Sequence, residues 1–150
     1  MSVVLEILNN RFIQAGFLAW AIAQTLKVVL TLIISKEFDK TRMWGSGGMP
    51  SSHSSTTCAL MMMIGFKQGF DSALFALAFA FSAIVMYDAA GVRRSTGKNA
   101  AVLNRLIDDL YKDGSFKEEH LKELVGHTPV QVLAGFTFGF PIGLLCCKYL

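Results

Sequence analysis

The sequence predicts an all-α integral membrane bundle of about four transmembrane helices, formed by a single domain over residues 1–150. Three observations predict it. The composition is 53% hydrophobic with only 17% charged residues, which is more apolar than a typical soluble domain. The apolar residues gather in blocks, several of them long enough to cross a hydrocarbon core. The basic residues lie almost entirely between these blocks. A length of 150 residues suits one domain.

The blocks predict the helices one by one. The first covers 12–35 and carries a single charge, Lys27. Its length suits a transmembrane helix. The blocks at 72–92 and 128–147 are also long and apolar, with Asp88 the single charge in the former. The block at 54–66 is shorter, and we expect it to span the membrane only if the serine-rich turn before it adds helical residues.

The polar segments between the blocks predict the orientation. The loops at 36–53 and 93–127 contain three and seven basic residues, whereas the opposite side carries only Arg11, Lys67 and Lys148. Basic residues favour the cytoplasmic side. We therefore expect both loops in the cytoplasm and both termini outside, in a bacterial plasma membrane or an organelle membrane. The same charges would also attract anionic headgroups.

The loop at 93–127 is the only sizeable polar segment. Its apolar residues recur at helical spacing over one stretch: Leu103, Leu106, Ile107 and Leu110. This predicts an amphipathic helix against the membrane face or the bundle, stopped by Asp113 and Gly114. We expect a second short helix over 117–125, ending at Gly126. His120 lies in a charged surface pattern there, and we expect it to be solvated.

Residues 45–55 form the most informative segment, with adjacent glycines, a proline, five serines and His53. Glycines let a backbone approach an anion closely, and amides at a helix start can hold phosphate oxygens. Pro50 and the serines favour a helix start that places His53 in the first turn. The segment predicts phosphate binding by Gly48, Ser51 and Ser52, with His53 exchanging a proton. The alternative is a purely structural histidine.

Two further segments add charge and a second histidine. Asp88 lies near the end of an apolar run, where a carboxylate is costly unless it is paired. Arg93 and Arg94 follow, and the planar guanidinium suits phosphate; the alternative is an interfacial anchor. His127 stands just before the last helix, which Thr128 would cap. The helix dipole favours its neutral form, which can act as a nucleophile.

Lys27 is the remaining candidate, with Gln24 three residues before it on the same helix face. A lysine within a membrane span is a functional candidate by default. Pointing inward, it would supply fixed positive charge for a phosphate. The alternative is that its side chain extends to the interface.

These segments together resemble the small divergent branch of the type 2 phosphatidic acid phosphatase superfamily, which is related to acid phosphatases and vanadium-dependent haloperoxidases. The matching segments lie in the same order along the chain: Gln24-x-x-Lys27, 47–54, 87–94 and 126–132. The resemblance implies that His53 protonates the leaving group and that His127 is the nucleophile. Two departures stand out. Thirty-two residues separate Arg94 from His127, where the superfamily has a handful, and Gln131 replaces the aspartate that orients the nucleophile. Asp88 could fill that role from another helix.

Three functions follow as hypotheses. The first is a membrane phosphatase acting on a phosphomonoester, such as a lipid phosphate, with no metal or cofactor. The second is a non-catalytic phosphate or phospholipid binder, or a lipid transporter. The third is a metal site of His53, His127 and Asp88, whose ligands are too dispersed to be preferred. We expect membrane lipids as partners and no nucleic acid, and a small bundle also allows a homodimer. The three cysteines predict free thiols.

Overall fold

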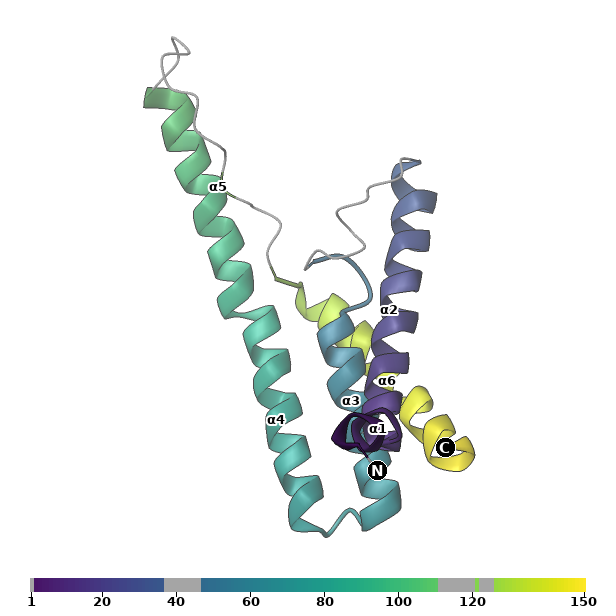
Figure 1. Cartoon of the computed structure of the whole chain (residues 1–150). Helices are drawn as coiled ribbons and strands as arrows, with labels where there is room; N and C mark the ends of the chain where they lie inside the picture. The colour runs from purple at the N-terminus through teal and green to yellow at the C-terminus, as the bar shows by residue number, and fades with distance from the viewer. Residues whose placement is uncertain (1, 37–46, 111–120, 122–125) are drawn as a thin grey trace.

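The computed structural model describes residues 2–36, 47–110, 121 and 126–150, and every regular element in that part of the chain is a helix. The all-α prediction is therefore confirmed. Figure 1 shows the arrangement. The helices are α1 (Val3–Leu8), α2 (Arg11–Ser35), α3 (Ser52–Gln68), α4 (Ala73–Ala90), α5 (Val92–Leu110) and α6 (Pro129–Tyr149).

Three stretches of the described chain are long and apolar enough to cross a membrane: Arg11–Ile34, Ala73–Asp108 and Pro129–Tyr149. The expected fourth span, α3, is shorter. It lies at the centre of the bundle and contacts α2, α4 and α6. Large apolar side chains of α2, α4 and α6 are exposed instead, as expected for surfaces that face lipid. The bundle thus consists of three apolar helices packed around a shorter central one.

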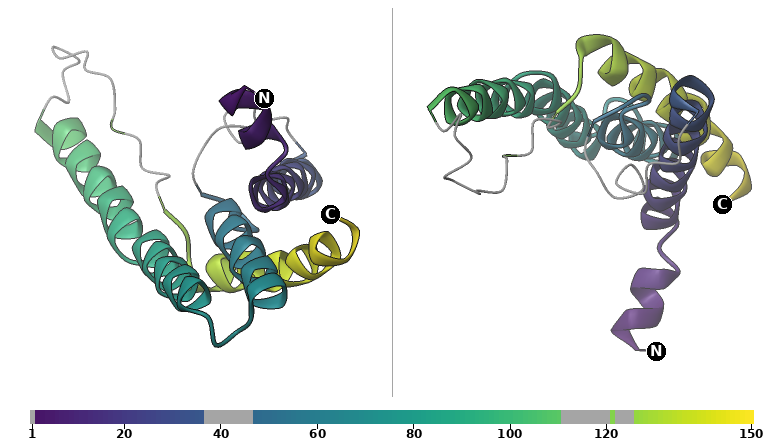
Figure 2. Two further views of the ribbon diagram at one scale, coloured as in Figure 1. Left: turned by 60° about the horizontal axis from the view of Figure 1, so that its bottom comes forward. Right: turned by 90° about the horizontal axis from the view of Figure 1, so that it is seen from above.

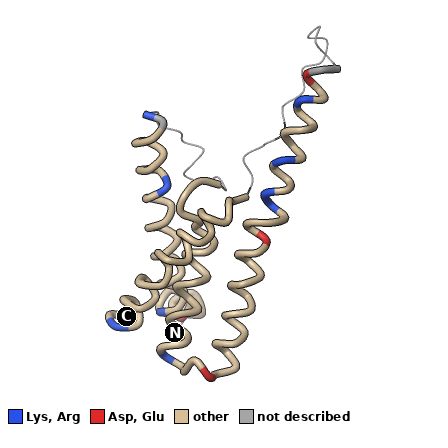
Figure 3. Tube along the Cα trace, turned by 180° about the vertical axis from the view of Figure 1, so that it is seen from behind, with Lys and Arg blue, Asp and Glu red and all other residues tan. Residues whose placement is uncertain are grey.

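The helices alternate in direction, so the two chain ends and the α3–α4 turn lie at one end of the molecule (Figure 1). The end of α2 and the whole of α5 extend toward the other end. Figure 3 shows basic residues along α5 and a long uncharged stretch in α4. The described parts of the two basic loops thus lie at one end of the molecule and both termini at the other, as the sequence predicted. Which side faces the cytoplasm stays a prediction.

Helices α3 and α6 pack together through three glycines four residues apart, Gly135, Gly139 and Gly143, which all lie against backbone of α3. A Cβ atom on Gly139 would collide with the carbonyl oxygen of Ser55 and lie 2.8 Å from Cβ of Cys58. Small residues at such spacing let two helix backbones approach closely in a membrane. This glycine seam fixes where the first turns of α3 and α6 meet.

Helix α2 packs on α3 through Ala15, Ala19 and Ala23, all of which are fully buried. The hydroxyl of Ser55 donates to the carbonyl of Ala19 at 3.4 Å. The next residue at the same four-residue spacing is Lys27. The packing of the alanines therefore turns this lysine toward the interior.

Helix α5 continues from α4 after a break at Gly91 (Figure 1). The expected amphipathic helix exists, but it starts directly after the membrane helix. Among the described helices it contacts only α4, and Figure 2 shows it pointing away from α2, α3 and α6. Of the two expected alternatives, the membrane face or the bundle, packing against α2, α3 and α6 is therefore excluded for the described part of α5. The buried amide of Asn104 instead bonds both backbone groups of Leu121, at 2.9 Å each.

Some expectations fall outside the described residues. They are the stop at Asp113 and Gly114, the second short helix over 117–125 except Leu121, and the solvated His120. The short helix α1 was not expected from the sequence. Its apolar side chains are exposed, and Asn10 after it caps α2 by accepting from the amides of Phe12 and Ile13.

Candidate phosphate site

The segment before α6 is packed onto the junction of α4 and α5. The amide of His127 donates to the carbonyl of Ala89 at 2.9 Å. Gly126 has φ +86°, and a Cβ atom there would collide with the backbone of Arg94. A side chain at this position would thus meet both a strained backbone and an occupied space. This contact brings Arg94 beside His127 in spite of the long intervening sequence.

The ring of His127 is 1% exposed, and its Nδ1 lies 3.1 Å from the carbonyl oxygen of Gly48. A carbonyl oxygen only accepts, so Nδ1 carries the hydrogen and Nε2 presents its lone pair. Within the described residues Nε2 is buried with no hydrogen-bond partner. A buried polar atom without a partner is unusual and needs an explanation. Here it is consistent with a ligand site.

Gln131 stands where the superfamily has the aspartate that orients the nucleophile, and its side chain caps α6. Its Oε1 accepts from the amide of Thr128 at 3.0 Å, and the Thr128 hydroxyl accepts from the Gln131 amide at 3.3 Å. This is a capping box that starts α6. Nδ1 of the His127 ring contacts the backbone carbonyl of Gly48, which sequence reasoning assigned only to phosphate.

His53 lies in the first turn of α3, as expected, after the N-cap Ser51. The centroids of the His53 and His127 rings are 5.9 Å apart, with an angle of 67° between the rings. Nδ1 of His53 is also buried without a partner in the described structure. Two neighbouring imidazole rings therefore each carry a buried nitrogen without a partner in the described structure.

Lys27 completes this part of the site. It is 1% exposed, and its Nζ donates to Oε1 of Gln24 at 2.5 Å. The alternative in which this side chain extends to the interface is therefore wrong. Burial lowers the pKa of His127 to about 4, and the nearby charges of Lys27 and His53 act in the same direction. Hydrogen bonding to the Gly48 carbonyl and to the Gln131 side chain opposes this shift. His127 is thus neutral near pH 7.

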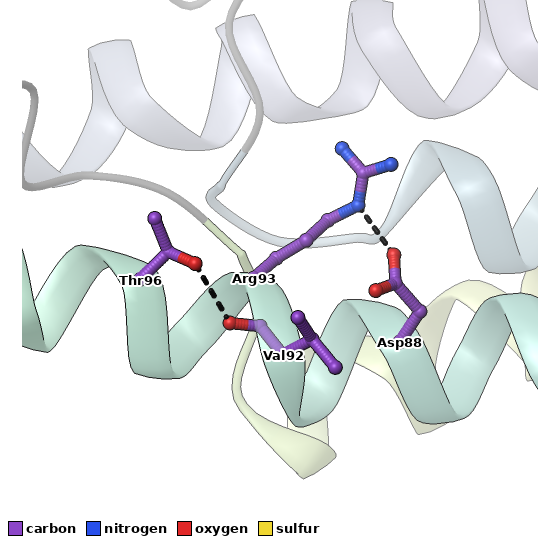
Figure 4. A network of polar contacts seen from close by, with 4 residues as sticks. All are labelled: Asp88, Val92, Arg93 and Thr96. Atoms are coloured by element: carbon purple, nitrogen blue, oxygen red, sulfur yellow. Dashed lines mark hydrogen bonds and ion pairs between the residues drawn. The ribbon is translucent and has the colours of Figure 1, made fainter.

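Asp88 and Arg93 form a partly exposed ion pair, with 2.6 Å between Asp88 Oδ2 and Arg93 Nε. Figure 4 shows the guanidinium turned back along the helix toward the carboxylate. The pair offsets the charge of Arg93 and satisfies the carboxylate at the end of α4. The carboxylate of Asp88 thus pairs with Arg93, and in the described structure it does not orient a histidine ring as the sequence suggested.

Ser51 and Ser52, which the sequence predicted as phosphate ligands, are both buried. Ser51 is fully buried, and its amide donates to the carbonyl of Gln131 at 3.1 Å. Its hydroxyl accepts from the amide of Ser54 at 3.4 Å. Ser51 therefore joins the starts of α3 and α6. Ser52 is 5% exposed at the first helical position.

A pocket of about 370 Å³ opens beside His127. Small residues leave much of its space free: Gly47, Gly48, Gly97, Ala101 and Gly126. Its charged lining residues, Arg94 and Lys98, lie one helical turn apart on α5. Sequence reasoning counted Lys98 only toward orientation. Its four-residue spacing from Arg94 was the signal that could have placed it here.

The described residues contain no group of three or more His, Cys, Asp or Glu side chains that could hold a metal ion. The three cysteines are free thiols, with Cys58 and Cys146 buried. The polar groups that do converge are two imidazoles, an ammonium group and glycine backbone. This set of groups suits an anion.

The sequence profile of the divergent PAP2 family matches residues 8–142, so the chain belongs to that family. A relative in Bacillus subtilis (strain 168), named "Uncharacterized membrane protein YuiD", is 37% identical over 156 residues. The alignment covers 97% of this chain and 99% of that protein. No solved structure matches the chain. Family membership and the apolar helices together identify a membrane protein of the divergent PAP2 class.

Proposed function

We propose that the protein is a membrane phosphatase that hydrolyses a phosphomonoester, with a phosphorylated lipid as the favoured substrate. One observation carries this proposal. A neutral, buried imidazole is held through Nδ1 by the Gly48 carbonyl, and its Nε2 has no partner among the described residues. An oriented imidazole with a free lone pair is a nucleophile. A second imidazole lies 5.9 Å away.

The reaction has two steps. Nε2 of His127 attacks phosphorus, and the bond from phosphorus to the leaving oxygen breaks. His53 gives its proton to that oxygen when it is protonated. Burial and the charges of Arg93 and Lys27 lower the pKa of His53, and the negative charge of a bound phosphate would favour its protonated form. Water then attacks the phosphohistidine, neutral His53 takes a proton from the water, and inorganic phosphate leaves with His127 restored. Lys27, Arg94 and the first-turn amides of α3 would stabilise the phosphoryl oxygens.

The site lies where several membrane helices begin or end, which favours a substrate whose phosphate is at the membrane surface. Arg93 and Arg94 follow the apolar α4 directly. The excess of basic residues in the loops beside the site supports an orientation in which the site faces the cytoplasm. A lipid phosphate could then reach the histidines while its chains stay in the bilayer.

A specific observation favours the second candidate function, a phosphate or phospholipid binder without turnover. The partner of His127 Nδ1 is a neutral carbonyl rather than a carboxylate. A carboxylate in this position would stabilise the positive charge that develops on the ring during attack. The carbonyl orients the ring but contributes less to that stabilisation, so the site could keep binding while turnover is slow.

Trapping the covalent intermediate separates the two functions. Purified protein in detergent would be mixed with lipid phosphate labelled with 32P and stopped in base, which preserves phosphohistidine. We expect label on the parent chain and none on His127→Ala. Label on His127→Ala would exclude this nucleophile. Phosphate binding by the parent without label or phosphate release would establish the binder instead.

A further inference from the structure

The α5 wall of the pocket carries two cationic side chains. Arg94 and Lys98 both line the cavity. In the described part of the chain neither has an ion-pair partner, whereas the neighbouring Arg93 is paired with Asp88. Two uncompensated cations beside one cavity predict an anionic ligand there.

The two cations lie at different distances from the nucleophile. Gly126, next to His127, packs against the backbone of Arg94. Lys98 lies four residues further along α5, about 6 Å along the helix axis. Gly97 and Ala101 add little side-chain volume to the same wall. The cavity therefore continues outward from His127 past Arg94 to Lys98.

A further positive charge, Lys27, acts on His127 from the other side. It comes from α2, is buried, and is absent from the lining of the α5 pocket. Its charge acts on both histidine rings. His127 thus lies between the Lys27 and His53 side and the Arg94 and Lys98 side. One tetrahedral phosphate between the two imidazoles would leave Lys98 without a role.

We propose that Lys98, together with Arg94, forms a second anion subsite, so that the protein takes a ligand with two anionic groups, such as a diphosphate. This proposal rests on the proposed function and narrows its substrate class. The phosphoryl group attacked by His127 lies between the imidazoles near Lys27. The second anionic group extends into the pocket along α5, where Lys98 binds its oxygens and Arg94, which lies nearer His127, contacts both anionic groups.

Binding of stable analogues to the full-length protein in detergent tests this proposal. The probes are methylphosphonate, with one anionic group, and methylenediphosphonate, with two. Both resist hydrolysis because a phosphorus–carbon bond replaces the phosphorus–oxygen bond that a phosphatase breaks. Calorimetry should show methylenediphosphonate binding at least about tenfold more tightly to the parent protein, because two charge-assisted contacts are added. This comparison needs no variant.

Two variants locate the effect. Lys98→Gln should weaken methylenediphosphonate about tenfold and change methylphosphonate less than about twofold. Arg105→Gln is the control, because Arg105 is an exposed cation of α5 that does not line the pocket; it should leave both affinities unchanged. Lys98→Arg should retain the preference.

The outcomes distinguish the two proposals. Equal affinity of the parent for both probes, or an equal loss of both in Lys98→Gln, would overturn the second subsite and leave the phosphate site standing. Failure of both probes to bind at millimolar concentration would overturn the phosphate site as well.

Discussion

Replacing Gly139 with alanine tests whether the glycine seam holds the bundle together. A methyl group at this position would collide with the Ser55 carbonyl, lie 2.8 Å from Cβ of Cys58 and lie 3.0 Å from Cα of Ser55. These neighbours are backbone or Cβ atoms of a helix, which rotamer changes cannot move aside. The two helices must therefore separate, and the contacts at Gly135 and Gly143 on either side resist that separation.

Gly16 provides a matched control on α2. A Cβ atom there would lie 3.6 Å from Cγ2 of Thr56, an ordinary van der Waals contact. Both substitutions gain about 0.8–1 kcal/mol from the higher helix propensity of alanine. Only Gly139→Ala also carries the cost of overpacking, about 1–3 kcal/mol. Because the propensity gain is common to both, the two variants should differ in unfolding free energy by about 1–3 kcal/mol.

Reversible unfolding in mixed micelles, with SDS as denaturant and helical circular dichroism as the signal, measures this difference. Gly16→Ala should be as stable as the parent or slightly more stable, and Gly139→Ala clearly less stable than Gly16→Ala. Equal stability of the two variants would show that α3 and α6 do not pack as closely as described. This comparison of unfolding free energies does not depend on what the protein binds or hydrolyses.

Three further predictions concern the site and its orientation. Gly126→Ala should weaken methylphosphonate binding by more than about tenfold, because the added methyl group displaces His127 from Arg94; calorimetry with unchanged affinity would contradict this. The low pKa of His127 means that only the unfolded chain gains this proton between about pH 6.5 and 4, so stability should fall as pH drops through that range. His127→Gln should flatten this fall in the SDS assay, and an unchanged pH slope would count against a neutral buried ring. In a background without native cysteines, Ser2→Cys should react with a membrane-impermeant maleimide added outside cells and Asn99→Cys should not; the reverse pattern would invert the orientation.

The sequence was sufficient for every described helix except α1, because the signals of these helices are local. Each apolar block, and each histidine with the helix start beside it, is defined by residues only a few positions apart. The interior position of Lys27 was only one of two alternatives. The choice between them depends on the alanines at residues 15, 19 and 23, which turn Lys27 inward only once α3 is packed against them.

The rest of the site depends on contacts between distant segments. The role of the Gly48 carbonyl could not be predicted, because Gly48 precedes His127 by 79 positions in the sequence and a backbone atom leaves no signature in side-chain patterns. The position of Arg94 beside His127 depends on the close approach of Gly126. Lys98 was overlooked because a basic residue in a loop has a sufficient explanation in membrane orientation.

The apolar helix α4 also sets the depth of the site in the bilayer. Its 18 residues rise about 27 Å, close to the roughly 30 Å thickness of a hydrocarbon core. If α4 stands upright with Ala73 at one edge of the hydrocarbon core, the break at Gly91 falls near the other edge, where lipid headgroups begin. A thicker bilayer would draw Arg93 and Arg94 toward hydrocarbon, and a thinner one would lift them into water. The composition of the surrounding membrane would thus determine how well a headgroup at the surface aligns with the two imidazoles.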